Sequence, residues 1–590
     1  MKKNRIFAKL LMLTLATTMF AGCGAPKTAT SPSAEAATGA DLVLKNGVVQ
    51  TMVNENDTAQ AVAVKGGKII YVGDNAGAQK FVGDKTEVID LAGQMVTPGF
   101  MDGHLHGPGA WLTKLYEISL SDSKTNEEYL DVVKKFVKAH PELEVYTGGR
   151  FSLNIYQKAD GSNPGPGKAD LDAICSDKPV YIWDTSHHSI WCNSKALEMA
   201  GITKNTPNPQ GGLITRDTSG EVTGYLTDTA ADLVSAKMPA VQYSEEQQIG
   251  AMEKFQEQCA SYGITGFTDI GERVSYDVIK KMDAEGKLTL RTRLVPIADP
   301  GEKPENMIKK VNNLKATDTG LVKAGTVKLF YDGVTEGGTA VFLEPYTKAA
   351  GKGDHWMGEP IWQNAEYENM ITALDAAGIQ VHVHAIGDGA VNETLTAYEK
   401  AQAANGEHDS RHTITHVCEI KNADIQRMAK LKVVAALQFL WMYGDDFYKL
   451  ESAYVGKDRA LSFYPTKNML DAGIVLAGAS DGAVSPFKVL DEIEVGVTRN
   501  SPYPGEEDTD MHRWPEQSLT AYQMLKAYTT NIAYENFEEK EIGTVEVGKR
   551  ADLVVLGRNI LKCNPKQISD TPIVYTISDG RIVYKNAESK

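Results

Sequence analysis

The chain has few cysteines for its length, six among 590 residues, and none of them forms a Cys-x-x-Cys pair. This scarcity excludes the dense disulfide framework of small secreted domains and the thiolate zinc site of finger domains. Basic residues are also in deficit, since 61 Lys and Arg face 77 Asp and Glu, giving a formal net charge of −16. The charge balance argues against nucleic acid and against an anionic membrane surface as partners.

The sequence also lacks an evident internal repeat and a hydrophobic run long enough for a stable membrane-spanning helix. Its hydrophobic content of 42% and charged content of 23% are those of a globular protein. A chain of 590 residues is too long for one simple core. We therefore expect one large domain and a smaller one.

The N-terminus has the pattern of an export signal. Four basic residues, Lys2, Lys3, Arg5 and Lys9, precede an apolar stretch from Leu10 to Phe20. The sequence Phe20-Ala21-Gly22-Cys23 that follows resembles the lipobox of bacterial lipoproteins, although Phe20 stands where Leu is usual. The resemblance implies a signal peptide over 1–22 and a lipid on Cys23. An ordinary secretory signal cleaved nearby is the alternative.

Residues 23–40 are rich in Ala, Thr, Ser and Pro, so they cannot bury a core and are expected to form a flexible tether. The protein would then be exported and held by its lipid at the outer face of the bacterial cell membrane. We expect no other membrane contact.

Short β-rich runs separated by glycine-containing turns occur at both ends of the chain. They occupy 41–97 and 540–588, and Asp579-Gly580 predicts a hairpin turn in the second segment. Two strand-rich ends around a long middle predict one discontinuous β-sandwich domain built from both termini.

The middle, 98–539, alternates strands and helices, the pattern of a parallel α/β sheet. One strand ends at His106, and seven more are predicted at 263–269, 289–296, 325–332, 379–385, 411–417, 432–439 and 474–480. Eight strands are the number of a TIM (β/α)8 barrel. The gap between the first two strands is too long for one crossover, so about 110–240 is expected to be an inserted subdomain over the barrel mouth.

His104 and His106 close the first of these strands. Residues i and i+2 of a strand point to the same face, so both imidazoles can reach one metal ion. An isolated pair of this kind is equally compatible with ordinary polar strand residues. Its position at the C-terminal end of a barrel strand is where such barrels keep their active sites.

Further ligand types close other predicted strands: His384, His416 and Asp481. Each of them alone fits a structural role, but several strand ends offering imidazole or carboxylate ligands favour a metal site. Lys328, in an apolar strand, faces a desolvation cost unless its charge is paired or removed.

The chain resembles the amidohydrolase superfamily, and within it the amidohydrolase-3 (YtcJ-like) family that includes N-substituted formamide deformylase. The resemblance covers nearly all of 41–584. It is carried by four segments, 98–106 (PGFMDGHLH), 327–333 (VKLFYDG), 384–388 (HAIGD) and 548–556 (GKRADLVVL).

The resemblance implies two divalent ions, expected to be zinc. His104, His106 and Asp481 would bind one ion, His384 and His416 the second, and Lys328 matches the carboxylated lysine that bridges them. Asp481 would also act as the catalytic base, and His188, in a segment expected near the substrate, would steady the oxyanion. His382 is the alternative ligand to His384, His187 is expected to be a neighbour of the site, and Asp332 and Asp388 are expected to orient ligands.

The sequence departs from the family pattern in three places. Thr415 stands where glutamate usually precedes the histidine of the sixth strand. Asp481-Gly482-Ala483 replaces Asp-Ala-Pro, and Thr227-Asp228 stands where a glutamate is common. None of these departures removes a metal ligand, so we expect them to affect which substrate is preferred and not whether metal is bound.

The sequence therefore predicts a hydrolase that cleaves a non-peptide C–N bond of a small molecule, an amide or N-substituted formamide, by metal-activated hydroxide. The same site acting on an ester, lactone or phosphotriester is an alternative. A lipid-anchored solute-binding protein is a further alternative, but it does not account for the ligands at the strand ends. An oligomer of identical chains is compatible with the sequence.

Overall fold

The structure is a computed structural model that describes residues 39–158, 162–482, 484–503, 505 and 512–587. The predicted signal peptide, Cys23 and nearly all of the predicted tether lie outside the described residues. Among the helices within these ranges, none is both long and apolar enough to cross a membrane.

The two chain ends build two neighbouring sheets. One has the strand order β5-β4-β1-β6 and comes from the N-terminal segment alone, while the other, β25-β24-β23-β7-β2-β3, takes strands from both ends. The strands are β1 (Leu42–Lys45), β2 (Val48–Gln50), β3 (Thr58–Ala59), β4 (Ala61–Lys65), β5 (Lys68–Gly73), β6 (Glu87–Asp90), β7 (Met95–Pro98), β23 (Leu553–Leu556), β24 (Ile573–Ser578) and β25 (Arg581–Lys585).

Side chains of both terminal sheets share one buried apolar cluster. Leu44 and Val62 of the first sheet pack in it with Val96 and Val555 of the second. The predicted turn between β24 and β25 is confirmed, because Asp579 and Gly580 have φ values of 48° and 77°. Positive φ at both central residues is the geometry of a tight hairpin turn.

The middle of the chain contains two parallel sheets, of order β17-β16-β15-β8 and β18-β19-β20-β21-β22. The strands are β8 (Phe100–Leu105), β15 (Ile264–Ile270), β16 (Arg291–Val295), β17 (Val322–Ala324), β18 (Thr326–Phe330), β19 (Gln380–Ala385), β20 (Thr413–His416), β21 (Val434–Leu437) and β22 (Leu476–Gly478). Each of the eight strands predicted from the sequence is present, and Gly325 alone separates β17 from β18.

Backbone hydrogen bonds join the two parallel sheets at both pairs of edges. The N–H of Lys328 on β18 donates to the carbonyl of Pro296, which follows β16, over 2.9 Å. At the other pair, the N–H of Asp481, which follows β22, donates to the carbonyl of His104 on β8, also over 2.9 Å. The strand ends that carry the predicted ligands are therefore held next to one another.

Helices follow the parallel strands and cover them. The main ones are α7 (Glu245–Ser261), α8 (Tyr276–Ala284), α9 (Pro304–Lys315), α10 (Asn364–Ala376), α11 (Asp388–Asn405), α12 (Asn422–Lys430), α15 (Thr466–Asp471), α16 (Val489–Thr498), α17 (Ala521–Ala527) and α18 (Thr530–Glu535). Apolar faces of these helices and the strands beneath them form the largest buried cluster of the described residues.

The long segment between β8 and α7 forms a sheet of its own, of order β13-β14-β12-β11-β10-β9. Its strands are β9 (Ile118–Ser119), β10 (Tyr146–Phe151), β11 (Val180–Asp184), β12 (Ser189–Cys192), β13 (Gly212–Arg216) and β14 (Val222–Asp228), with helices α2 (Gly109–Tyr116), α3 (Asn126–Ala139), α4 (Lys168–Asp172), α5 (Ser194–Ala200) and α6 (Thr229–Ser235). It has two buried apolar clusters of its own.

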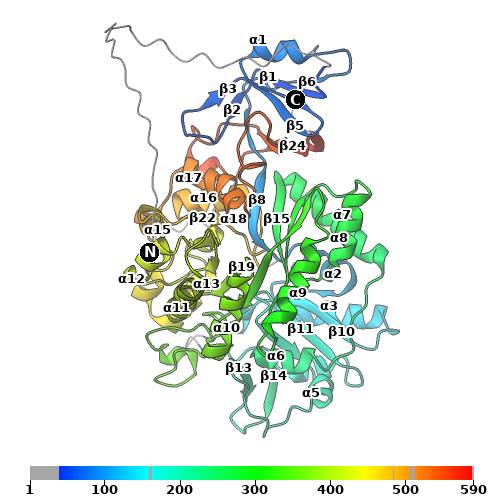
Figure 1. Cartoon of the computed structure of the whole chain (residues 1–590). Coiled ribbons are helices and arrows are strands. Elements are labelled where there is room, and N and C mark those ends of the chain that lie inside the picture. The colour runs from blue at the N-terminus through cyan, green and yellow to red at the C-terminus, as the bar shows by residue number, and fades with distance from the viewer. Residues whose placement is uncertain (1–38, 159–161, 483, 504, 506–511, 588–590) are drawn as a thin grey trace, which may run out of the picture. The chain divides into compact units, whose positions relative to one another are not determined.

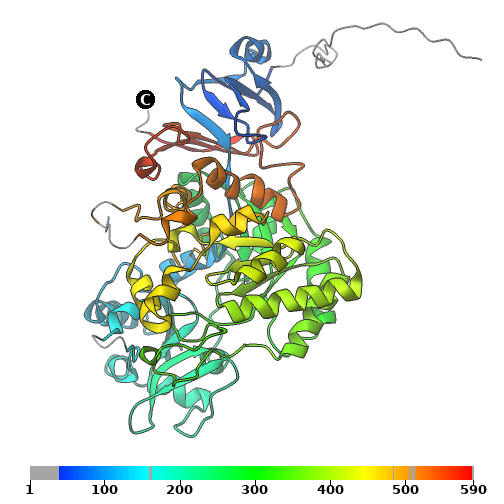
Figure 2. The same cartoon turned by 90° about the vertical axis from the view of Figure 1, so that its left-hand side faces the viewer.

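Both views show the terminal sheets at one end of the parallel strands and the β9–β14 sheet at the other (Figures 1 and 2). Strand β8 leaves the terminal sheets and runs towards the β9–β14 sheet, so the carboxyl ends of the parallel strands face that sheet (Figure 1).

Candidate metal centre

His104, His106 and Asp481 converge at the carboxyl ends of β8 and β22. The Nε2 atoms of His104 and His106 lie 3.4 and 3.3 Å from Asp481 Oδ1. That oxygen is buried and makes no hydrogen bond to any described residue. The three ligand atoms lie within 4.8 Å of one another. Two imidazole nitrogens and a carboxylate oxygen without a hydrogen bond are the donor set of a divalent metal, and these residues fit one.

The charge states of His104 and Asp481 also suit a metal. Burial lowers the pKa of His104 well below its usual value, and the Lys328 amine lowers it further, so the imidazole is neutral. Burial alone would raise the pKa of Asp481, but the two imidazoles beside it hold that pKa well below the usual value. Neutral imidazole and ionised carboxylate are the protonation states that bind a cation.

The backbone fixes these side chains. Asp102 Oδ1 accepts hydrogen bonds from the N–H groups of His104 and Ser480, each over 3.1 Å, and so connects β8 to the end of β22. Asp481 has a φ of 56°, in the left-handed region that Asp tolerates better than most residues. A Cβ at Gly482 would lie 2.6 Å from Leu105 Cδ1 and 3.0 Å from Phe487 Cβ. An alanine side chain at this position would therefore crowd Leu105 and Phe487.

Lys328 reaches the same point from β18. Its side chain is fully buried, and its Nζ lies 3.5 Å from His104 Nε2 and 4.6 Å from the centre of the Phe330 ring. Burial lowers the pKa of Lys328 to about 7, against the opposing pull of Asp481. A large share of the amine is therefore uncharged at neutral pH.

His384 on β19 and His416 on β20 form a neighbouring pair, with ring centres 4.4 Å apart. The His416 ring centre lies 5.4 Å from that of His104, so the pair adjoins the triad without joining its cluster of ligand atoms. His384 Nε2 donates to the Gly333 carbonyl over 3.1 Å, and His416 Nδ1 donates to Gln438 Oε1 over 2.9 Å. Each ring therefore keeps a lone pair on its other nitrogen.

The two predicted orienting carboxylates have different surroundings. Asp332 accepts hydrogen bonds from the N–H groups of Val341, Ile386 and Gly387, and its Oδ1 lies 3.6 Å from His384 Nε2. Asp388 instead accepts from the Leu343 N–H over 2.8 Å and lies 3.1 Å from Lys421 Nζ. Asp388 therefore holds a loop, and no contact in the described structure joins it to a predicted ligand.

Two further histidines, His382 and His187, lie beside the ligands. His382 Nε2 is 2.9 Å from His104 Nδ1, which leaves His104 Nε2 directed at Asp481. Glu535 Oε1 lies 3.7 Å from His382 Nδ1, so His382 connects the His104 ring to the Glu535 carboxylate. The ring centre of His187 is 6.3 Å from that of His106, and His187 makes no closer ring contact with a ligand.

His188 enters the site from the β9–β14 sheet. Strands β12 and β14 pair in antiparallel fashion, with Ser189 opposite Thr227, so His188 lies beside Asp228. His188 Nδ1 donates to Asp228 Oδ1 over 2.7 Å, and its ring centre is 4.8 Å from that of His384. Burial opposes protonation, but the hydrogen bond and charge of Asp228 raise the pKa of His188. Asp228, one of the three departures, therefore favours a protonated His188.

Three residues near the site were not predicted from the sequence. Gln438 receives the His416 hydrogen bond, and its own amide donates to Thr415 Oγ1 over 3.4 Å. It directly follows the apolar strand β21, so the strand-end pattern could have found it. Trp441 stacks on His416, with an interplanar angle of 3°, and Glu336 follows β18 in a loop. The sequence has no comparable signal for these two.

A pocket of about 200 Å³ opens onto these residues. Its lining includes His188, His384, His416 and Asp481, together with the aromatic residues Trp441, Tyr443, Phe447, Tyr464 and Tyr503. Aromatic rings and charged groups, among them Glu336, Glu451 and Arg513, thus line the same small-molecule-sized cavity.

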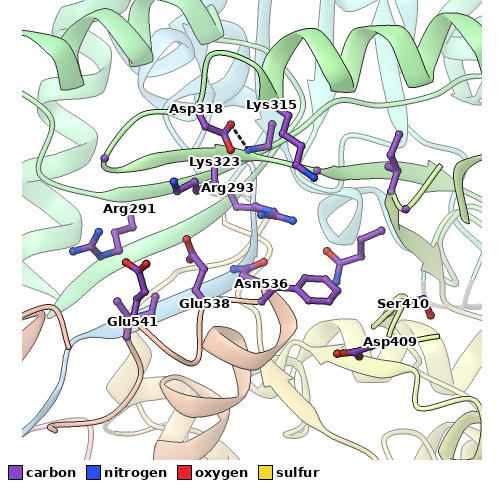
Figure 3. A pocket seen from close by; sticks show the side chains of 18 of the residues that line it. Arg291, Arg293, Lys315, Asp318, Lys323, Asp409, Ser410, Asn536, Glu538 and Glu541 are labelled. Atoms are coloured by element: carbon purple, nitrogen blue, oxygen red, sulfur yellow. Dashed lines mark hydrogen bonds between the residues drawn. The ribbon is translucent and has the colours of Figure 1, made fainter. Parts of the chain in front are cut away.

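A larger cavity, of about 520 Å³, lies at the amino ends of the parallel strands (Figure 3). It is lined by charged groups, among them Arg291, Arg293 and Glu538, and by none of the predicted ligands. Arg291 pairs with Asp552 and with Asp579, which ties β16 to the terminal strands. Because His384, His416 and Asp481 line the smaller pocket, that pocket is the candidate active site.

Comparison with known proteins agrees with this geometry. Residues 87–584 match the amidohydrolase family. The chain is 30% identical over 552 residues to YtcJ of Bacillus subtilis (strain 168), which covers 92% of this chain and 99% of that protein. It is 26% identical over 559 residues to an N-substituted formamide deformylase of Arthrobacter pascens, which covers 93% and 99% of the two chains.

Solved structures show the same fold. An uncharacterized metal-dependent hydrolase from Pyrococcus horikoshii OT3 superposes with a TM-score of 0.67 at 22% identity, covering 89% of this chain and 99% of that one. Its counterpart from Pyrococcus furiosus gives a TM-score of 0.64 at 25% identity, covering 88% and 100%. With a family match over most of its length and a His-His-Asp centre at the strand ends, this chain belongs to the amidohydrolase family and is a hydrolase.

Proposed function

We propose that the protein cleaves a non-peptide C–N bond, in an amide or an N-substituted formamide, by metal-assisted hydrolysis. The observation that carries the proposal is the convergence of His104 and His106 on a buried Asp481 oxygen that has no hydrogen bond. The similarity to an N-substituted formamide deformylase over most of both chains supports this class of bond.

The residues suit a centre for two zinc ions. His104, His106 and Asp481 would hold one ion, and His384 and His416, each with a free ring nitrogen, would hold the second. Lys328, buried beside His104, would bridge them as a carbamate. Its uncharged amine attacks CO2 and releases one proton, which turns a costly buried cation into an anionic ligand. The ions, when bound, supply Lewis acidity that polarises the substrate carbonyl and acidifies water.

The remaining chemistry belongs to the side chains. Asp481 accepts the proton of the attacking water and returns it to the leaving nitrogen, so the amine departs uncharged. His188, kept protonated by Asp228, donates a hydrogen bond from Nε2 to the oxygen on which negative charge develops. Gln438 and the Gly333 carbonyl fix the rings of His416 and His384.

We infer further that the eight parallel strands close into one TIM barrel, with β17 and β18 as two parts of a single strand. The hydrogen bonds of Lys328 to Pro296 and of Asp481 to His104, at the two pairs of sheet edges, support closure. The shared core of the two terminal sheets supports a discontinuous sandwich beside this barrel.

The test of the proposed function is metal content measured together with hydrolysis. Protein purified without chelator is expected to contain about two zinc ions per chain, the metal that His-rich sites with carboxylates favour. A panel of N-formyl and N-acyl amines should include a substrate whose hydrolysis stops with a chelator and returns with zinc. Elemental analysis that finds no transition metal would overturn the proposal.

Two other outcomes are informative. A single ion per chain would remove the carbamate bridge and leave a mononuclear centre. Turnover of esters, lactones or phosphotriesters, with none of the C–N substrates, would assign the same centre to the alternative reaction, since activated water is not selective for one electrophile.

We propose also that the enzyme is exported and anchored through a lipid on Cys23 at the outer face of the cell membrane. The basic and apolar segments before Cys23 and the Phe20-Ala21-Gly22-Cys23 sequence support this localisation. The substrate would then be met outside the cytoplasm.

Cys23→Ala is expected to move the enzyme from the membrane fraction to the soluble fraction, or to leave it unprocessed. Its kcat and KM should not change, because the polar segment after Cys23 separates the lipid from the folded residues. Fractionation and labelling with a radioactive fatty acid measure the effect. Label retained by the variant would show that the anchor is elsewhere.

A further inference from the structure

Glu336 lies in a tightly hydrogen-bonded loop that follows β18 and lines the active-site pocket. Within the loop, the Val334 N–H donates to Thr339 Oγ1 over 3.1 Å and the Thr339 N–H donates to the Val334 carbonyl over 3.0 Å. The His384 ring is bonded to the Gly333 carbonyl at the start of the same loop. Glu336 is therefore held in a fixed position relative to a predicted metal ligand.

The carboxylate of Glu336 differs from the other acidic groups of the pocket. Glu451 pairs with Arg513 over 2.7 Å, and Asp445 accepts the Tyr448 N–H over 2.9 Å at the start of helix α13 (Asp446–Val455). Asp481 belongs to the triad. Glu336 has a hydrogen bond to its own backbone N–H, and no cation of the described chain lies within ion-pair distance of it.

Glu336 is partly buried, and a carboxylate that is shielded from water and has no cation beside it is costly to ionise. Burial, with the nearby charges of Glu451 and Asp184, raises the pKa of Glu336 to about 8, and His188 opposes that rise. The Glu336 carboxyl group is therefore mostly protonated at neutral pH, and its ionisation lacks a positive partner within ion-pair distance among the described residues. A ligand that brings a positive charge would supply that partner.

The walls of the pocket suit the same kind of ligand. Trp441 and Tyr464 line it together with Tyr443, Phe447 and Tyr503. Aromatic faces attract ammonium and guanidinium groups through their quadrupoles, and a carboxylate beside them adds charge pairing. A neutral apolar substrate would use the rings but would leave Glu336 without a partner.

We propose that the pocket selects substrates carrying a positively charged group, an ammonium or guanidinium, which Glu336 pairs with while the scissile C–N bond lies at the metal centre. The inference rests on the proposed function for the identity of the bond. Recognition of the cation, however, depends on Glu336 and the aromatic walls and not on the metal.

Binding to metal-free protein tests recognition separately from catalysis. The probe is benzyltrimethylammonium, whose charge does not change with pH, with benzyl alcohol and phenylacetate as neutral and anionic counterparts. Calorimetry is expected to show binding of the cation in preference to both. Glu336→Gln should weaken cation binding by about tenfold or more, since a charge pair in a buried site is lost.

Glu344→Gln is the matched control. Glu344 follows in the chain, its side chain is 66% exposed, and it does not line the pocket. The control is expected to bind the cation as the wild-type protein does. Equal binding of the three probes, or an unchanged affinity in Glu336→Gln, would overturn the inference.

The pH dependence of binding gives a second readout. Below about pH 8 the cation must displace the Glu336 proton, so affinity should rise about tenfold per pH unit up to that pH and then level. Other charged groups face Glu336 across the pocket, namely Asp184, His188, Asp445, Glu451 and Arg513. The rise is therefore assigned to Glu336 only if Glu336→Gln abolishes it, and a rise that persists in this variant would contradict the assignment.

Kinetics of the zinc-loaded enzyme separate this inference from the proposed function. N-formyl amines with and without a distal ammonium are compared, and Glu336→Gln should raise KM for the charged substrate by a larger factor than KM for the neutral one. Cation binding without hydrolysis of any C–N substrate would sink the proposed function but keep the cation site. Hydrolysis that favours neutral substrates, with no cation binding, would keep the proposed function and overturn the cation site.

Discussion

Asp481→Asn is expected to lower kcat by about 10²–10⁴-fold, the range for loss of a positioned general base. Asn keeps the size of Asp and one coordinating oxygen, but it cannot accept the proton of the attacking water at neutral pH. The substitution suits the backbone, because Asp481 has a φ of 56° and Asn tolerates that region as well as Asp does. We therefore expect a normal fold and at least partial retention of metal. Turnover, metal content and Tm are measured on one preparation.

Asp552→Asn provides the control for this prediction. Asp552 is 7% exposed and pairs with Arg291 at the opposite end of the parallel strands. Its substitution should lower Tm and leave kcat near that of the wild-type enzyme, because a buried charge pair is broken far from the pocket. If Asp481→Asn lowered Tm strongly and changed turnover only slightly, Asp481 would be a structural residue. Turnover within about threefold of wild type, with metal retained, would assign the proton transfer to another group such as His188.

The strand-end pattern explains how much of the site the sequence predicts. His104, His106 and Asp481 each close an apolar strand, and parallel strands bring their carboxyl ends to one edge. The same reasoning extends to Gln438, which follows the apolar strand β21 but was not identified. Local sequence thus identifies side chains that lie in a strand or within a few residues of its end.

Loops limit such prediction. Glu336 and Trp441 reach the pocket because the bond of His384 to the Gly333 carbonyl and the stacking of Trp441 on His416 place the segments after β18 and β21. Asp388 shows the converse, since its place at the end of the HAIGD segment predicts a contact with the ligands, whereas its carboxylate bonds to Leu343 and Lys421. A residue close to a ligand in the sequence can have different surroundings when a helix begins at that residue, as α11 does at Asp388.

Lys328→Ala is expected to remove the second zinc ion and to lower turnover by about two orders of magnitude or more. This loss is larger than the loss expected from changing a residue that only orients a metal ligand. Lys328 is fully buried, and its Nζ lies 3.5 Å from His104 Nε2. Carboxylation would make it an anionic bridge, and alanine cannot provide one. Elemental analysis and kcat measure the two effects.

Lys328→Arg and Lys328→Met distinguish the carbamate from a role of the buried chain in packing. Arginine keeps a positive charge and cannot be carboxylated, so it should repel the metal and fail to restore activity. Methionine fills a similar volume without a buried charge, so it should preserve or raise Tm while leaving turnover as low as in the alanine variant. Short carboxylic acids added to Lys328→Ala should restore part of the activity, because a free carboxylate can occupy the space of the carbamate. Wild-type turnover in any of these variants would contradict the bridge, and full activity in Lys328→Met alone would reduce the lysine to a packing residue.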